Sequence, residues 1–221
     1  MSRLLKAAIA LVALLAVLQV GVPVLAARAV AAELARRGIP AARVQVTAFP
    51  FWMLAQGRFQ DLRVAAPSAR LGPVPVEGLT ADWRNGQVAI RPLEAGNLVV
   101  QREGRLQVRF RLTGTGVADL LASSGVVRNP VVHIHDGILD VTGTLTLDGI
   151  ALPLSTSGRL GLSPHGRHIV YQPANVDGLD LPVPTAITVL NVSSLGLPLA
   201  LHLTGLVVGT GTVAVTLENR P

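Results

Sequence analysis

Apolar residues follow two different periods along the chain. Residues 7–27 are 21 consecutive positions without a charge, and a helical composition rich in alanine, leucine, glutamate and arginine continues to about Arg37. Gly38 then offers a helix cap and Pro40 a stop. From Val44 onward apolar and polar residues alternate, which is typical of strands with one buried face. The pattern predicts one long N-terminal helix followed by a β-rich body.

The N-terminal segment has two interpretations, and both send the rest of the chain across a membrane. Arg3 and Lys6 precede the apolar run, and residues 24–26 (Val-Leu-Ala) form an acceptable cleavage site for a secretory signal. The run is also long enough to be kept as a membrane-spanning helix. We therefore expect residues 1–27 to be a signal peptide or transmembrane anchor, with the N-terminus inside. Residues 28–221 are expected to form a single β-rich domain in an extracytoplasmic location, membrane-anchored or secreted.

Strand-like alternation is clearest at residues 105–112, 137–147, 197–208 and 212–217. Pairs of residues that favour turns separate the strands: Gly72-Pro73, Asn85-Gly86, Asp136-Gly137 and Asp148-Gly149. Residues 115–125 predict a short helix with a Thr or Gly cap, and residues 183–191 are a weaker helix candidate. Because no βαβ rhythm appears, the expected fold class is α+β, mostly β, with an antiparallel sheet and a few short helices.

Composition narrows the classes of function. Half of the residues are apolar, only 14% are charged, and cysteine is absent, which excludes disulfides and thiolate sites. The net charge of +6 is scattered, so we expect no nucleic-acid partner, and it is compatible with a mild attraction to anionic lipid. Arg105, Arg109 and Arg111 have two interpretations, a solvated sheet face, which we favour, or a cationic strip for lipid phosphates.

Candidate catalytic and metal chemistry is sparse. His133 and His135 could share a metal from one strand face, but Asp136-Gly137 predicts a hairpin turn that leaves both in solvent. The glycine-rich stretches at Gly114 and Gly209 lack the lysine of a phosphate-binding loop. The chain has no Gly-x-Ser-x-Gly motif and no informative pair of carboxylates. We expect no catalytic residues, no metal and no cofactor, so the chain is not expected to be an enzyme, and a hydrolase of envelope components is the weakest alternative.

The stretch VTAFPFWMLAQGRFQDL, residues 46–62, holds four of the seven aromatic residues. Alternation brings a strand to Ala48, Pro50 forces a turn, and residues 51–56 have helical composition up to Gly57. A second strand then begins. The stretch therefore predicts an apolar plug between two strands, which either caps the core or forms part of a binding site.

This stretch also resembles a known family. Phe-Pro-Phe, a short apolar segment, Gly-Arg-Phe and then Asp-Leu-Arg-Val are similar to the LmeA-type phospholipid-binding family of bacterial envelope proteins. Residues 110–123 and 195–217 resemble further segments of that family. The resemblance implies a phospholipid ligand, no cofactor, and a fold similar to tubular lipid-binding proteins, in which a long curved antiparallel sheet wraps a long N-terminal helix and leaves an apolar groove.

From these features we expect an extracytoplasmic protein that holds phospholipid acyl chains in an apolar groove and serves lipid handling in the cell envelope. Its expected partners are phospholipid and, through the N-terminal segment, a membrane. The alternative is a membrane-anchored structural or protein-interaction domain without a lipid ligand, whose protein partner is unknown. The candidate lipid-binding residues are Phe49, Phe51, Trp52, Met53, Leu54, Phe59 and Phe110.

Overall fold

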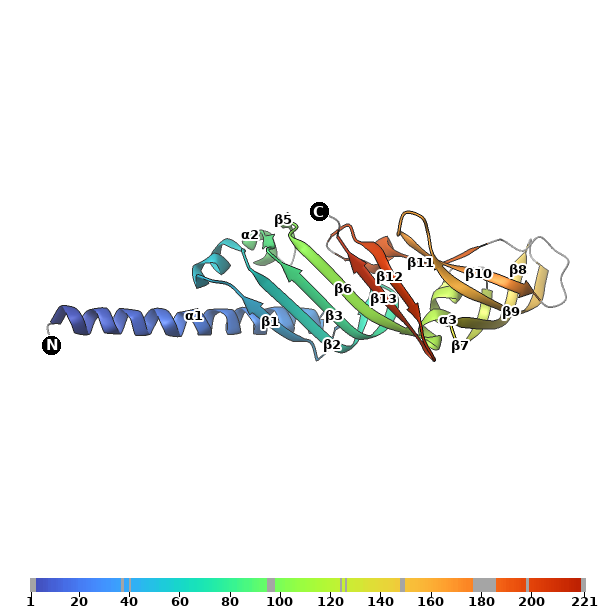
Figure 1. Cartoon of the computed structure of the whole chain (residues 1–221), viewed down its shortest axis with the longest axis horizontal. Coiled ribbons are helices and arrows are strands. Elements are labelled where there is room, and N and C mark those ends of the chain that lie inside the picture. The colour runs from blue at the N-terminus through green and yellow to red at the C-terminus, as the bar shows by residue number, and fades with distance from the viewer. Residues whose placement is uncertain are drawn as a thin grey trace. The chain divides into compact units, whose positions relative to one another are not determined.

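The computed structural model describes residues 3–36, 38–39, 41–94, 98–123, 125, 127–147, 150–176, 186–197 and 199–219. Figure 1 shows the order of elements along the chain. They are α1 (Arg3–Arg36), β1 (Arg43–Thr47), the 3-10 helix η1 (Phe51–Gln56), β2 (Asp61–Leu71), β3 (Val74–Arg84), β4 (Gln87–Val88), α2 (Ile90–Glu94), β5 (Val100–Arg102), β6 (Arg105–Thr113), α3 (Gly114–Ser123), β7 (Val127–His135), β8 (Ile138–Leu147), β9 (Ile150–Leu162), β10 (His168–Val176), β11 (Ile187–Asn191), the 3-10 helix η2 (Val192–Leu195), β12 (His202–Val208) and β13 (Thr212–Glu218).

The strands in the described part of the chain form three sheets. One has the order β1-β2-β3-β6-β13-β12, the second β11-β10-β9-β8-β7, and β4 pairs with β5 in a small third sheet. The pairings of β1 with β2 and of β7 through β11 with their neighbours are antiparallel. The predicted fold class, α+β and mostly β with an N-terminal helix and a few short helices, is confirmed.

The chain divides into two compact units. The first contains the residues up to Ala66 together with Thr80–Leu106, and the second contains Pro67–Leu79 together with the chain from Gln107. Strands β2 and β3 contribute residues to both units. The expectation of a single domain after residue 27 stays a prediction.

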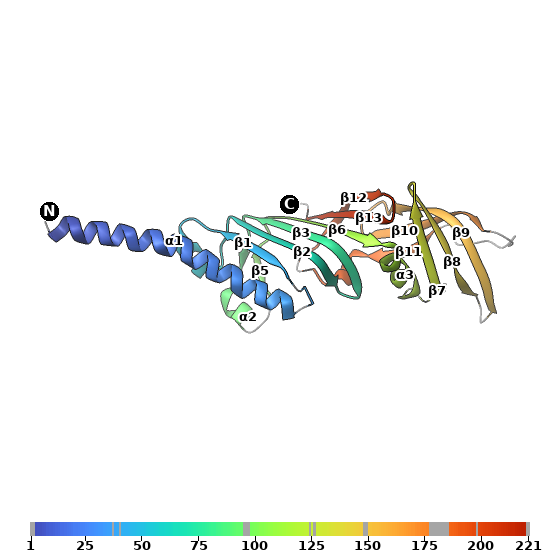
Figure 2. The ribbon, with the colours of Figure 1, turned by 90° about the horizontal axis from the view of Figure 1, so that it is seen from below.

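The first unit is built on α1, which packs against β1 and η1. In Figure 2 the C-terminal part of the helix runs beside β1, and its N-terminal half extends beyond that strand. Gly38 has a φ of +88°, and its N–H donates to the carbonyl of Ala35. This conformation is open to glycine at little cost, so it ends the helix where the sequence predicts.

The second unit holds most of the core. Of the 35 buried apolar side chains in the described part of the chain, 29 belong to this unit and six to the first. Within it, Val108, Phe110 and Leu112 of β6 are buried, as their alternation predicts. The predicted helix at residues 115–125 corresponds to α3, and its first turn is capped by Thr113, whose hydroxyl accepts from the N–H of Gly116.

One predicted helix is wrong. Residues 187–191 form strand β11, which pairs with β10, while residues 183–185 lie outside the described residues. Ile187 and Val189 are buried at alternate positions of this strand. Branched side chains pack well on a sheet, and that packing overrides the weak helical composition.

Candidate functional site

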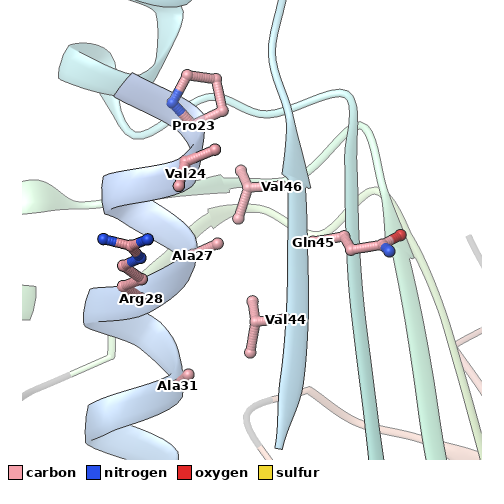
Figure 3. A pocket seen from close by; sticks show the side chains of 8 residues that line it. All are labelled: Pro23, Val24, Ala27, Arg28, Ala31, Val44, Gln45 and Val46. Carbon is pink, nitrogen blue, oxygen red and sulfur yellow. The ribbon is translucent and has the colours of Figure 1, made fainter. Parts of the chain in front are cut away.

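A groove lies in the first unit, between α1 and β1. Its cavity volume is about 440 Å³, and its lining residues are Pro23, Val24, Ala27, Arg28, Ala31, Val44, Gln45 and Val46. Figure 3 shows the helix on one side and the strand on the other. Each of these lining residues is exposed or partly exposed, so the groove is open to its surroundings rather than sealed.

The helix wall of the groove is made by small residues. Val24, Ala27 and Ala31 are three and four residues apart, a spacing that places side chains on one helical face. An alanine side chain is a single methyl group, so β1 can run beside α1 without the space between them being filled. Pro23 lies within the helix and has no N–H to donate to the carbonyl of Gln19.

The strand wall is made by Val44 and Val46. Successive side chains of a strand point to opposite faces, so these two valines point one way and Gln45 the other. Figure 3 shows both valines directed toward α1 and Gln45 directed away from it. The valines are only half-buried, although they face another element of the same unit. The space between helix and strand is therefore walled mostly by aliphatic side chains.

Charge is confined to the rim of the groove. Among the described residues that line the groove, Arg28 is the one charged residue, and it is exposed. In Figure 3 its side chain points away from Val44 and Val46. A ligand between helix and strand would contact mostly aliphatic side chains and would make few hydrogen bonds, which suits a hydrocarbon chain. A cationic group at the rim is suited to a phosphate.

Gln19 joins α1 to the aromatic stretch. Its side-chain Nε2 donates to the carbonyl of Ala48 at 2.8 Å, and its Oε1 accepts from the backbone N–H of Phe51 at 3.0 Å. The most polar side chain of the apolar run thus makes one hydrogen bond through each of its two polar atoms. These two bonds fix the start of η1 against the helix.

The aromatic stretch has the predicted architecture of strand, short helix and strand. Residues 51–56 form η1, and Gly57, with a φ of +70°, ends it. A β-carbon at this position would lie 1.9 Å from the carbonyl oxygen of Val88, so both the backbone conformation and the space require glycine. The Phe49–Pro50 peptide bond is cis.

The seven candidate lipid-binding residues do not form one cluster. Phe49 and Trp52 are 66% and 54% exposed, while Phe51, Met53 and Leu54 are half-buried in η1. Phe59 is 7% exposed and packs edge-on against Trp83 with ring centres 5.0 Å apart. Phe110 is buried and belongs to the second unit. Phe59 and Phe110 are core side chains, and the lipid-binding role of all seven stays a prediction.

The groove residues were not among the sequence candidates. The spacing of Val24, Ala27 and Ala31 and the alternation of Val44 and Val46 are visible in the sequence, but they do not say which helix faces which strand. The predicted binding residues came mostly from the aromatic stretch instead, because the chain has few aromatic residues elsewhere.

The two histidines lie where the hairpin prediction puts them. His133 and His135 are exposed in β7, just before the Asp136-Gly137 turn. The Nδ1 of His135 is 3.4 Å from a carboxylate oxygen of Asp140. Within the ranges that the structure describes, no group of three or more histidine, aspartate or glutamate side chains is arranged to hold a metal ion.

The chain matches a known protein family. The family model described as LmeA-like phospholipid-binding matches residues 18–218. No curated protein and no solved structure matches the chain. The matched region begins one residue before Gln19, so it includes the part of α1 that lines the groove.

Proposed function

We propose, because this chain belongs to the LmeA-like phospholipid-binding family, that it holds phospholipid acyl chains in the groove between α1 and β1. Lipid binding itself follows from the family. The location of the ligand and the handling of envelope lipids without catalysis are our proposal. Their support comes from the apolar lining of the groove, its rim arginine, and the apolar N-terminal helix.

The observation that carries the proposal is the apolar surface that the first unit leaves uncovered. Val24, Val44 and Val46 face the same space, yet none of them is buried. Burying an apolar side chain contributes about 1.5–3 kcal/mol, and each buried methylene of a ligand about 0.8 kcal/mol. An acyl chain in the groove would gain contact from both walls at once. The volume of about 440 Å³ lies within the range of about 300–1,000 Å³ that is common for small-molecule sites.

The N-terminal helix supports an extracytoplasmic location. Within the described residues, one helical stretch is long and apolar enough to cross a membrane by length and composition, and it is the part of α1 from Val17 to Arg36. A signal sequence has the same properties, and either role would place the β-rich body of the chain outside the cytoplasm. The described lining of the groove consists of aliphatic walls and an arginine at the rim. Such a lining is suited to binding, whereas a catalytic site needs an acid, a base or a nucleophile.

Filling the groove tests the proposal. Ala27→Phe would place a ring between the helix and β1, whereas Ala32→Phe adds the same ring on an exposed face of α1. Lipid extracted from the two purified full-length variants is quantified by mass spectrometry, with circular dichroism to verify the fold. We expect Ala27→Phe to lose most of the phospholipid that Ala32→Phe retains. Equal amounts of lipid in the two folded variants would exclude this groove as the site.

The same experiment addresses the protein-interaction alternative. If the wild-type chain carries no phospholipid and does not take it up from vesicles, the domain without a lipid ligand becomes the better account. Lipid bound by the wild type and lost only on filling the groove supports the lipid-binding function.

A further inference from the structure

We propose that α1 is retained as a membrane anchor and that the turn carrying Phe49 and Trp52, which we call the tip of the first unit, inserts into the bilayer beside it. The surface concerned consists of Val17, Val20, Leu25, Phe49 and Trp52, which we call the apolar foot. This inference does not depend on an occupied groove. It concerns where the domain meets the membrane.

The apolar foot is exposed to an extent that is unusual for large apolar side chains. Val17, Val20 and Leu25 of α1 are 68%, 69% and 64% exposed. The bonds from Gln19 to Ala48 and Phe51 place the exposed Phe49 and Trp52 at the same level of the helix. Large exposed apolar surfaces mark sites that contact a membrane or a partner. Tryptophan is enriched where a membrane meets water.

Three backbone carbonyls at the tip are paired, which lowers the cost of placing them in lipid. The carbonyls of Ala48, Phe49 and Pro50 accept hydrogen bonds from the side chain of Gln19, the side chain of Gln60 and the N–H of Met53. Pro50 has no N–H to satisfy. In hydrocarbon an unpaired backbone group costs several kcal/mol, whereas in water the solvent would satisfy it. A turn with this pairing can enter the bilayer without leaving those groups unsatisfied.

The length of α1 puts the tip at an interfacial depth. A bilayer core of about 30 Å is crossed by about 20 helical residues. A span that begins just after Lys6, the last charge before the apolar run, therefore ends near Ala26, and Gln19 lies about 10 Å inside that boundary. Apolar faces of interfacial segments insert by about 5–10 Å. Arg28, the first charge after the apolar run, would then lie on the outer side of the membrane.

The fold also opposes removal of the segment. Cleavage after Ala26 would detach Gln19, which holds η1, and with it Pro23 and Val24 of the groove wall. The remaining helix would begin in the middle of its contact with β1. We therefore choose the anchor, rather than the cleaved signal, for residues 1–27.

Tryptophan fluorescence tests the inference in the full-length chain. The chain has two tryptophans, the exposed Trp52 and the buried Trp83. The protein is reconstituted into phospholipid vesicles that contain lipids brominated near the headgroup or near the chain end. We expect bromine near the headgroup to quench the wild type more strongly, and Trp52→Phe to abolish most of the quenching. The intact mass of the chain from the membrane fraction should include residues 1–26.

The outcomes are separable from those of the groove. The groove-filling Ala27→Phe variant should keep the Trp52 quenching, because the bilayer is unchanged by it. If Ala27→Phe removes the quenching, Trp52 reports groove lipid and the inference fails. Absent quenching in the wild type, unchanged quenching in Trp52→Phe, or a mature chain that starts after Ala26 would also overturn it. If Ala27→Phe keeps both the Trp52 quenching and its bound lipid, the groove is not the lipid site, whereas the proposed membrane insertion stands.

Discussion

Replacing Gln19 with leucine removes the side chain that ties α1 to the start of η1. Leucine is similar in size, favours helix, and keeps the apolar run intact. The change therefore acts on two hydrogen bonds, the one that Gln19 donates to Ala48 and the one that it accepts from Phe51. Both bonds are partly buried, so the freed carbonyl and N–H would be only partly rehydrated.

The expected loss follows from those two bonds. Each contributes about 1 kcal/mol net, so Gln19→Leu should lower the free energy of unfolding by about 2 kcal/mol. For a chain of this size the unfolding temperature should fall by about 4–8 °C. If the region opens locally, the hydrogen-exchange protection of the Phe51 amide should fall roughly 30-fold, since about 1.4 kcal/mol corresponds to a factor of ten.

Thermal unfolding and hydrogen exchange of the full-length chain measure these effects. Gln101→Leu is the matched control, because Gln101 is exposed on β5 in the same unit. The control should change neither quantity. A Gln19→Leu chain with wild-type stability and an equally protected Phe51 amide would refute the role of Gln19 as the link between helix and η1.

Three further changes test the packing. Phe59→Ala should lower the free energy of unfolding by about 3–5 kcal/mol in a denaturant titration, whereas exposed Phe49→Ala should change it by less than about 0.5 kcal/mol; similar losses would contradict the assignment of Phe59 to the core. Gly57→Ala should be strongly destabilising in the same titration, because its φ is +70°, and an unchanged midpoint would be inconsistent with that strained position. Burial raises the pKa of Tyr171 above its ordinary value of 10.0. The contribution of Tyr171 to the free energy of unfolding is therefore fully present below about pH 10 and is lost as the pH rises through the folded pKa. Tyr171→Phe should remove that part of the alkaline loss measured by unfolding at each pH, and an identical loss would show that another group causes it.

Local features of the fold could be predicted from the sequence. Gly38 ends α1 because its positive φ costs glycine little, and such ends leave a clear signal in the chain. The alternation of Val108, Phe110 and Leu112 identified the buried face of β6. The corner at residues 46–62 was also predicted, because Pro50 and Gly57 restrict the backbone locally. The family resemblance is confirmed by the match over residues 18–218.

Features that depend on tertiary contacts could not be predicted. Phe49 and Phe59 lie in the same aromatic stretch, yet one is exposed and the other is in the core. The difference comes from Trp83, which is distant in sequence and packs on Phe59 alone of the two. The groove likewise depends on the packing of α1 against β1. Residues 187–191 form a strand because they pair with β10.

The most direct test of the groove is to find which residues touch the acyl chains. Cells that express the full-length chain would be supplied with phospholipid that carries a photoreactive acyl chain, and cross-linked positions would be mapped by mass spectrometry. Helix α1 would also react with bilayer lipid, so strand β1 is the informative element. We predict cross-links at Val44 and Val46, which face α1. We predict none at the exposed Thr47, which strand alternation places on the opposite face. Cross-links that avoid β1, or that mark Thr47 as strongly as Val46, would contradict a lipid site in this groove.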